Sequence, residues 1–231
     1  MEKTAASTAK AIHGKPRERV VSLRSEAYQT IRRQIINCTL KPGEAVTLTD
    51  LASDLDIGRT PVSQAVDRLT LEGLMEVIPR KGIVVAPVSI DDLVQIIEVR
   101  LLTEAQAVRW AAERAGADDI AAMRRNLDGN WTAARAKDID AMISFDSEFH
   151  RLLNGASGNR ILADLVGNLH DRSIRFWSIS LRAANHGVHV CEQHTEILEG
   201  IAAGDPDRAE KAVRAHITAF NQNIMAQLLR L

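Results

Sequence analysis

Residues 47–74 constrain the fold more than any other part of the chain. Their apolar side chains fall at helical spacing in two short runs, and Gly58 lies between the runs as a tight turn. Thr47, with Asp50 three residues later, forms a capping box at the start of the first run, and Thr60, followed by proline, is a cap candidate for the second. Two short helices joined by a tight turn predict a DNA-binding helix-turn-helix.

The outer side of the second helix is expected to meet the DNA. Val62, Val66 and Leu69 share its inward face, which leaves polar residues on the outer side of its first turns. After this helix, residues 75–86 alternate like two short strands around a basic tip, which predicts a wing. We therefore expect DNA contacts from six residues of the two elements: Arg59, Thr60, Ser63, Gln64, Arg80 and Lys81.

The length of the chain and the positions of its glycines and prolines indicate two domains after a short tail. A chain of 231 residues suits two hydrophobic cores. Residues 1–22 are expected to form a flexible basic tail, residues 23–88 a winged helix-turn-helix domain that begins with a helix over 23–37, and residues 89–231 an all-helical domain. Glycine and proline positions divide that domain into six helices. They are expected at about 90–114, 118–136, 139–154, 159–183, 188–203 and 206–230.

Charge is distributed unevenly between the two predicted domains. Residues 1–88 hold 13 Lys and Arg against 10 Asp and Glu, whereas the rest holds 16 against 20. The first 24 residues carry six basic and two acidic side chains, and a basic tail before a helix-turn-helix fits contact with DNA phosphates. A solvated tail without a partner is the alternative for residues 1–13.

Composition excludes several other classes of protein. Apolar residues make up 45% of the chain and charged residues 26%, which is ordinary for a globular protein. No apolar run is long enough to span a bilayer, and the polar start lacks the core of a signal peptide. Cys38 and Cys191 match no metal or redox spacing, so we expect two reduced structural thiols in a cytoplasmic protein without a membrane partner.

Charged residues inside apolar helix faces predict a metal site in the helical domain, because such domains normally keep charge off the inward face. Asp146 and His150 lie four residues apart, so their side chains project side by side. His194 and His216 interrupt the apolar faces of two later helices. One carboxylate and three imidazoles suit Zn²⁺, Ni²⁺, Mn²⁺ or Fe²⁺, with coordination positions left for a ligand.

Arginine also interrupts apolar faces in this domain. Arg100 follows three inward apolar residues, and Arg172 continues another apolar stripe. An inward guanidinium can grip a carboxylate at two points, although an intrahelical ion pair with Glu104 is an equal alternative for Arg100. A metal beside arginines predicts a small organic acid as the effector. Its expected contacts are Arg100, Asn168, Arg172 and Arg175.

Plainer interpretations of the same residues stay open. An Asp-x-x-x-His pair on a helix is more often a hydrogen-bonded pair than a metal site, and His194 alone could be a core histidine. A metal site closed by protein ligands has the same sequence as one open to an acid, so a structural metal without an effector is a further alternative. The remaining histidines fit no site and are expected at the surface or in packing: His13, His170, His186 and His189.

An enzyme is the competing class of function. Asp146, His150 and His194 could form the two-histidine, one-carboxylate iron site of an oxygenase. Against this interpretation, His216 closes a further coordination position, the scaffold is a helical bundle, and a winged helix precedes it. We therefore expect no enzymatic activity.

The second helix carries a distinctive sequence that can be compared with known patterns. Residues 58–74 are Gly-Arg-Thr-Pro-Val-Ser-Gln-Ala-Val-Asp-Arg-Leu-Thr-Leu-Glu-Gly-Leu. This segment resembles the form Ser-Arg-Thr-Pro-Val-Arg-Glu-Ala-Leu-x-x-Leu-x-x-Glu-Gly-Leu of the GntR superfamily of bacterial transcriptional regulators, in its FadR-like branch with a helical FCD effector domain. The resemblance implies DNA contacts at Arg59 and Thr60. Three positions depart from it: Gly58 replaces a serine cap, Gln64 a glutamate, and Ser63 an arginine used against DNA, which implies a variant operator or weaker binding.

The helical half resembles the FCD domain in three further patterns. These are Phe-Asp-x-x-Phe-His-x-x-Leu at 145–153, Glu-Gln-His-x-x-Ile-Leu at 192–198 and Ala-His-Ile at 215–217. The resemblance covers about residues 20–231, and six expected helices match the shorter VanR-like subgroup. It implies effectors such as sugar acids, hydroxy acids or dicarboxylates, and a homodimer on palindromic operator DNA. The family's metal ligands fall on Asp146, His150, His194 and His216, and its first-helix arginine falls on Arg100.

The sequence thus predicts a mainly α protein with a winged helix-turn-helix domain and a C-terminal helical bundle. The expected function is that of a ligand-responsive, DNA-binding transcriptional regulator, a repressor in the favoured interpretation. A divalent metal is the expected cofactor, and operator DNA, an organic acid and a second copy of the chain are the expected partners.

Overall fold

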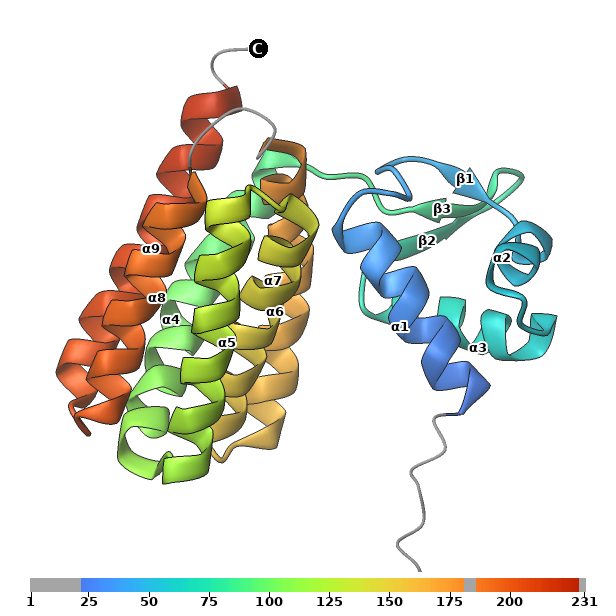
Figure 1. The fold of residues 1–231 in the computed structure, drawn as a ribbon. Coiled ribbons are helices and arrows are strands. Elements are labelled where there is room, and N and C mark those ends of the chain that lie inside the picture. The colour runs from blue at the N-terminus through green and yellow to red at the C-terminus, as the bar shows by residue number, and fades with distance from the viewer. Residues whose placement is uncertain (1–21, 181–185, 229–231) are drawn as a thin grey trace, which may run out of the picture.

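The computed structural model describes residues 22–180 and 186–228. The predicted basic tail therefore lies outside the described residues except for Ser22. The described residues form two domains that lie side by side, a small mixed domain and an elongated helical bundle (Figure 1). This arrangement confirms the predicted fold class.

The N-terminal domain is a winged helix-turn-helix. Its elements are α1 (Leu23–Ile36), β1 (Ala45–Val46), α2 (Leu48–Leu55), α3 (Arg59–Leu71), β2 (Met75–Ile78) and β3 (Gly82–Val85). The strands form an antiparallel sheet in the order β1-β3-β2, so the predicted wing hairpin gains an extra short strand at its edge. The inward faces of α1 and α3 fill a separate core around Ile31, Val62 and Leu69, all fully buried.

Capping explains where the two short helices begin. The hydroxyl of Thr47 accepts a hydrogen bond from the backbone N–H of Asp50 at 3.1 Å, as the capping pattern predicted. The cap of α3 is Gly58, which makes no side-chain hydrogen bond, and Thr60 lies within the first turn of the helix. The expectation that Thr60 caps this helix is therefore wrong. The helix starts two residues earlier than a Thr60 cap would place it, and Pro61 is compatible with its first turn.

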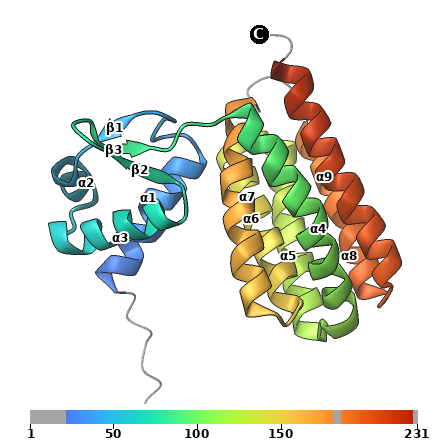
Figure 2. The same cartoon turned by 180° about the vertical axis from the view of Figure 1, so that it is seen from behind.

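The C-terminal domain is an all-helical bundle, as predicted. Its helices are α4 (Ile90–Arg114), α5 (Ala117–Ala136), α6 (Ile139–Ala156), α7 (Arg160–Ser180), α8 (His186–Ala202) and α9 (Pro206–Leu228). These bounds lie within about two residues of the predicted ones, and the expected ends at 181–183 and 229–230 fall outside the described residues. Ser89 caps α4 by accepting from the backbone N–H of Asp92 at 3.5 Å. Seen from behind, one connecting segment without regular structure leads from β3 into α4 (Figure 2). Among the described helices, none is long and apolar enough to cross a membrane.

Helix α7 provides most of the hydrogen bonds between the two domains. The guanidinium of Arg32 on α1 donates twice to the carboxylate of Asp171, at 2.6 and 2.5 Å. On the same helix, Asn168 donates from Nδ2 to the carbonyl of Glu72 at 2.8 Å, and Arg175 donates to a carbonyl in the linker after β3. The N-terminal domain is thus held by one face of a helix that also belongs to the core of the bundle.

A close approach of the backbones of α8 and α9 gives a stability prediction. A Cβ atom on Gly200 of α8 would lie 2.8 Å from the backbone N and Cα of Ala209 on α9, whereas a Cβ on Gly167 of α7 would meet nothing within 4 Å. We expect Gly200→Ala to lower the free energy of unfolding by about 1–3 kcal/mol because the backbones must separate. Gly167→Ala should raise it by up to about 1 kcal/mol by favouring the helix. Urea denaturation of both variants checks this pair, and equal effects would contradict the close packing.

Candidate functional site

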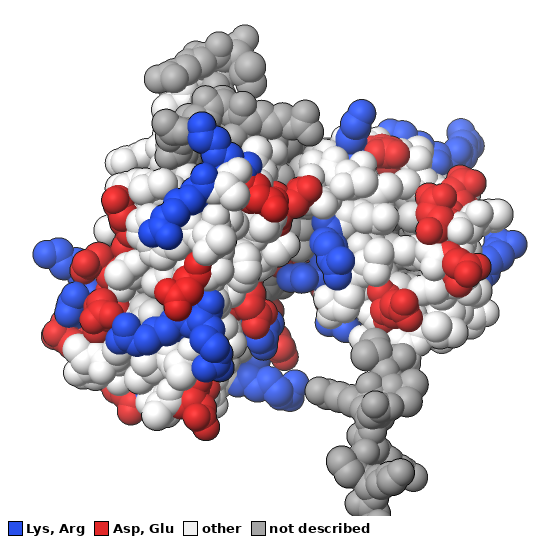
Figure 3. All heavy atoms as spheres, viewed as in Figure 1, with Lys and Arg blue, Asp and Glu red and all other residues white. Residues whose placement is uncertain are grey.

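The predicted DNA-contacting residues are exposed on two elements of the N-terminal domain. Arg59, Thr60 and Gln64 are exposed on α3, and Ser63 is partly exposed on the same helix. The other two predicted residues, Arg80 and Lys81, are exposed at the turn between β2 and β3. Figure 3 shows basic side chains at the outer rim of this domain. The geometry is that of a helix able to enter a major groove beside a wing able to reach phosphates.

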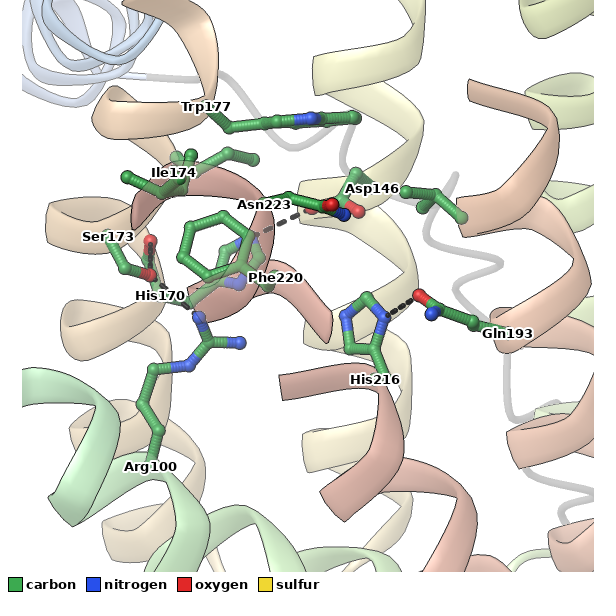
Figure 4. Close-up of a pocket in the computed structure, with 12 residues that line it drawn as sticks. Arg100, Asp146, His170, Ser173, Ile174, Trp177, Gln193, His216, Phe220 and Asn223 are labelled. Atoms are coloured by element: carbon green, nitrogen blue, oxygen red, sulfur yellow. Dashed lines mark hydrogen bonds and ion pairs between the residues drawn. The ribbon is translucent and has the colours of Figure 1, made fainter. Parts of the chain in front are cut away.

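The predicted metal ligands come together inside the helical bundle. Asp146 and His150 lie on α6, His194 on α8 and His216 on α9, and each is at most 5% exposed. The Asp146 Oδ1 atom is 3.5 Å from His194 Nε2, and ligand atoms of the three histidines lie within 4.8 Å of one another. His216 is oriented through its Nδ1 atom, which lies 2.9 Å from Oε1 of Gln193 (Figure 4). The second nitrogen of that ring is left for a ligand.

Two further residues of the cluster were missed by the sequence analysis. His170, expected at the surface or in packing, is 4% exposed, and its Nε2 atom lies 3.3 Å from Oδ2 of Asp146. It falls outside the site predicted from the sequence because the stripe followed on α7 is the one facing the N-terminal domain. The signal was present in Val166, His170 and Trp177, which share the buried face. Of the other unassigned histidines, His189 is exposed as expected, while His13 and the side chain of His186 are not described.

The second missed residue is Glu104, which is fully buried beside the cluster. Its Oε2 atom lies 3.4 Å from His150 Nδ1, and its Oε1 atom accepts a hydrogen bond from Arg100 Nε at 2.5 Å. Arg100 Nη1 also donates to the hydroxyl of Ser173 on α7 at 2.8 Å. Arg100 is thus ion-paired within α4, as one interpretation expected, and it lines the same small cavity as Asp146. Glu104 links it to a histidine of the cluster.

The electrostatics of the cluster keep its donor atoms available. Burial by itself would raise the pKa of Asp146, but His170, His150 and His194 outweigh it and hold this pKa well below its ordinary value. Burial lowers the pKa of His194 to about 3 and that of His170 to about 4, and it holds the pKa of His216 well below its ordinary value. The carboxylate is thus charged and these imidazoles are neutral at neutral pH, the protonation states that metal ligation requires.

Unsatisfied nitrogen atoms are the strongest sign of an absent group. Among the described residues, His150, His170 and His194 have both ring nitrogens buried without a hydrogen-bond partner. Leaving a buried polar atom unsatisfied costs about 1–3 kcal/mol, so a cluster of such atoms calls for a compensating ligand. Neutral imidazoles around one carboxylate are the donors that divalent transition metals prefer. The residues present fit a metal ion.

Two cavities adjoin the cluster. The first has a volume of about 30 Å³ and is lined by Arg100, Asp146 and His216 together with apolar residues such as Trp177 and Phe220 (Figure 4). The second is larger, about 890 Å³, and opens between α1, α6 and α7, where Figure 3 shows a hollow between the domains. His150 lines this larger cavity. The cluster can therefore be approached both within the bundle and from the side of the DNA-binding domain.

Three of the four residues expected to hold an organic acid do not line the small cavity. Asn168 and Arg175 bind backbone carbonyls of the N-terminal domain, and the guanidinium of Arg172 lies next to Gly73. Their expected placement around the acid beside Arg100 was wrong because α7 turns this face toward the other domain, where exposed carbonyls accept their hydrogen bonds. Arg100 alone of the four lies beside the metal-site cluster.

Comparisons with known proteins agree with both halves of this description. Residues 23–85 match the model of bacterial regulatory proteins of the gntR family, and residues 95–219 match that of the FCD domain. The Nta operon transcriptional regulator of Aminobacter aminovorans is 34% identical over 190 residues, which cover 80% of this chain and 86% of that one.

Two proteins of Escherichia coli extend the comparison. The HTH-type transcriptional repressor RspR (strain K12) is 23% identical over 199 residues, 86% of this chain and 87% of that protein. The solved structure of McbR/YncC superposes with a TM-score of 0.80 at 24% identity, and the match covers 91% of this chain and 99% of the other. The structural likeness extends across both domains.

Proposed function

The chain belongs to the gntR family of bacterial regulatory proteins and carries an FCD domain, and from this we propose that it is a metal-dependent regulator that responds to a small organic acid. As a member of this family it is a DNA-binding transcriptional regulator and not an enzyme. The proposal concerns the finer points: the metal, the acid, and the action on the operator.

The observation that carries the proposal is the cluster of unsatisfied imidazole nitrogens around Asp146. His150, His194 and His216 would hold the metal together with this carboxylate. A bound divalent ion supplies a Lewis-acidic position at which a carboxylate can bind. Arg100 lies in the adjoining cavity, where its guanidinium can pair with the same anion. A metal and an arginine on one small cavity favour an acid over a neutral ligand.

Binding of the acid would be coupled to movement of α7. The cavity of about 30 Å³ is too small for an organic acid of several atoms, so the acid must displace side chains such as Trp177 and Phe220. Arg100 donates a hydrogen bond to Ser173 of α7, and Asp171 on the same helix accepts hydrogen bonds from Arg32 of the DNA-binding domain. An acid that draws Arg100 away therefore disturbs the helix that holds this domain. The response exists only if the acid prefers one arrangement of the domains.

We further propose that the protein acts as a homodimer on palindromic DNA and that it is a repressor. A two-fold symmetric pair of winged helices meets two half-sites one turn apart, and a change in domain arrangement alters their spacing. The relative RspR, named a repressor, supports this direction of action. Release of the operator by the acid is the expected response.

A metal without an effector is the second candidate, and the small cavity favours it. In that case His150, His194, His216 and Asp146 would close the coordination of the ion and stabilise the bundle. The operator affinity of metal-loaded protein, measured by fluorescence anisotropy against a panel of sugar acids, hydroxy acids and dicarboxylates, separates the two. Release by one acid supports the effector role. Binding of DNA unchanged across the panel, with metal bound, supports the structural role.

The DNA-binding assignment gives a direct prediction for α3. Arg59→Ala is expected to weaken binding to the operator selected from genomic fragments by about 10- to 100-fold, because a guanidinium in the major groove contributes about 1–3 kcal/mol. Arg160→Ala serves as the matched control, since this arginine is exposed on α7 in the other domain. Equal affinities of the two variants would remove Arg59 from the DNA contact.

A further inference from the structure

His170 has the same relation to Asp146 as the predicted ligand His194 has. One oxygen of the carboxylate, Oδ2, lies 3.3 Å from His170 Nε2, and the other, Oδ1, lies 3.5 Å from His194 Nε2. Two neighbouring ligand atoms that each lie about 2.1 Å from one ion are separated by about 3.0 Å around a six-coordinate ion and by about 3.4 Å around a tetrahedral one. Both separations fit a metal held between the atoms, so the geometry gives His170 as strong a claim as His194.

A second set of distances places His170 among the ligands. Its ring centroid is 4.3 Å from that of His150, and ligand atoms of Asp146, His150 and His170 lie within 4.8 Å of one another. The set formed by His150, His194 and His216 meets the same limit. His150 belongs to both sets, and Asp146 lies between them. The two sets therefore converge on one region of the bundle.

A packing role alone does not account for the polar surroundings of His170. The side chain is 4% exposed, its Nε2 atom lies 3.3 Å from the charged carboxylate of Asp146, and neither ring nitrogen makes a well-formed hydrogen bond among the described residues. A buried histidine retained only for packing normally donates its ring N–H to a carbonyl or a hydroxyl. The hydroxyl of Ser173 donates to the backbone carbonyl of His170 and accepts from Arg100, and it makes no hydrogen bond to the His170 ring.

We propose that His170 is a fifth protein ligand of the metal, in addition to Asp146, His150, His194 and His216. The inference rests on the proposed function, since it presupposes that a metal binds. Four imidazoles and one carboxylate exceed the four positions of a structural zinc site and favour an ion that takes six ligands, such as Ni²⁺ or Fe²⁺. One coordination position then remains for an external carboxylate.

The fifth ligand also brings the metal to the helix that contacts the DNA-binding domain. His170 immediately precedes Asp171, whose carboxylate binds Arg32 of α1. Among the described residues, His170 is also the one that lines both cavities next to the cluster. Ligation through His170 therefore fixes α7 at the point of domain contact, which ligation through α6, α8 and α9 alone would not do.

The test counts coordinated imidazoles in the full-length protein loaded with Co²⁺. Each imidazole bound to this paramagnetic ion gives one strongly shifted, exchangeable ring N–H signal in proton NMR. The wild type is expected to give a signal for each of the four buried histidines, and His170→Ala should lose one. His170→Gln should lose the same signal although it can still hydrogen-bond to Asp146, which separates ligation from support of the carboxylate. His189→Ala, on the exposed side of α8, should keep all signals.

The possible outcomes separate this inference from the function on which it rests. Three signals in the wild type, unchanged in His170→Ala, would overturn the fifth ligand while leaving a metal site. Failure of the wild type to bind Co²⁺ or any other divalent ion would contradict the proposed function itself. A drop in metal affinity in His170→Ala is expected in addition, by about 10-fold or more.

Discussion

Loading the protein with a divalent metal should raise its unfolding temperature by about 5–10 °C, and His194→Ala should abolish this increase. A free ion at one hundred times its dissociation constant adds about 2.7 kcal/mol to stability, and in a chain of this size each kcal/mol shifts the midpoint by about 2–4 °C. The effect is large because the metal compensates several buried nitrogens at once. His194 is fully buried and is central to the cluster through its contact with Asp146.

The measurement is a thermal melt of chelator-treated protein against protein titrated with Ni²⁺, Zn²⁺, Mn²⁺ or Fe²⁺. His189→Ala is the matched control, because this histidine lies on the same helix and is exposed. Should His194→Ala itself unfold, Asp146→Asn keeps the size of the side chain and removes its charge. A metal-induced shift of wild-type size in both His194→Ala and Asp146→Asn would place the metal elsewhere in the protein.

Arg32→Ala is expected to uncouple the two domains. The guanidinium makes two hydrogen bonds to Asp171, whose side chain is only 7% exposed, so its removal leaves a buried carboxylate without a partner. Loss of one partner from a buried pair costs about 3–5 kcal/mol, and we expect a value near the lower limit because Arg32 is 27% exposed. The domain contact should weaken, and unfolding should separate into two transitions.

The double variant Arg32→Ala with Asp171→Asn tests the physical reason for this effect. Replacing the carboxylate by a neutral amide removes the unpaired charge, so the double variant should be more stable than Arg32→Ala alone. Arg33→Ala, an exposed neighbour on α1, is the control. Differential scanning calorimetry and proteolysis at the linker after β3 provide the readouts. One cooperative transition in Arg32→Ala, at the wild-type temperature, would show that the pair does not hold the domains together.

Uncoupling should also change regulation while leaving metal binding intact. In Arg32→Ala the winged helix keeps α3 and its exposed residues, so DNA can still bind. The response of operator affinity to the acid should decrease, because the ion pair is a direct link between α7 and the DNA-binding domain. The position next to it in the chain is His170, so this response and the metal site meet on one helix.

Local patterns determined much of this protein. Turn and cap residues such as Thr47 and Ser89 fixed the starts of helices, since a cap satisfies backbone N–H groups within four residues of chain. The spacing of Asp146 and His150 put them on one inward face, since side chains four apart on a helix are neighbours. These inferences succeeded because each depends on contacts within one turn of helix.

The sequence by itself determined the two domains, the helix-turn-helix with its wing, and the convergence of Asp146 with three histidines on inward faces. Only the tertiary structure decided which way α7 faces. One face of that helix packs in the bundle and another packs against the N-terminal domain, so both faces carry apolar residues. The periodicity of the sequence therefore cannot tell which face points into the bundle. Packing turned His170 toward Asp146, and it turned Asn168 and Arg175 toward carbonyls of the other domain. Contacts between residues far apart in the chain depend on how whole helices pack, and no local pattern specifies them.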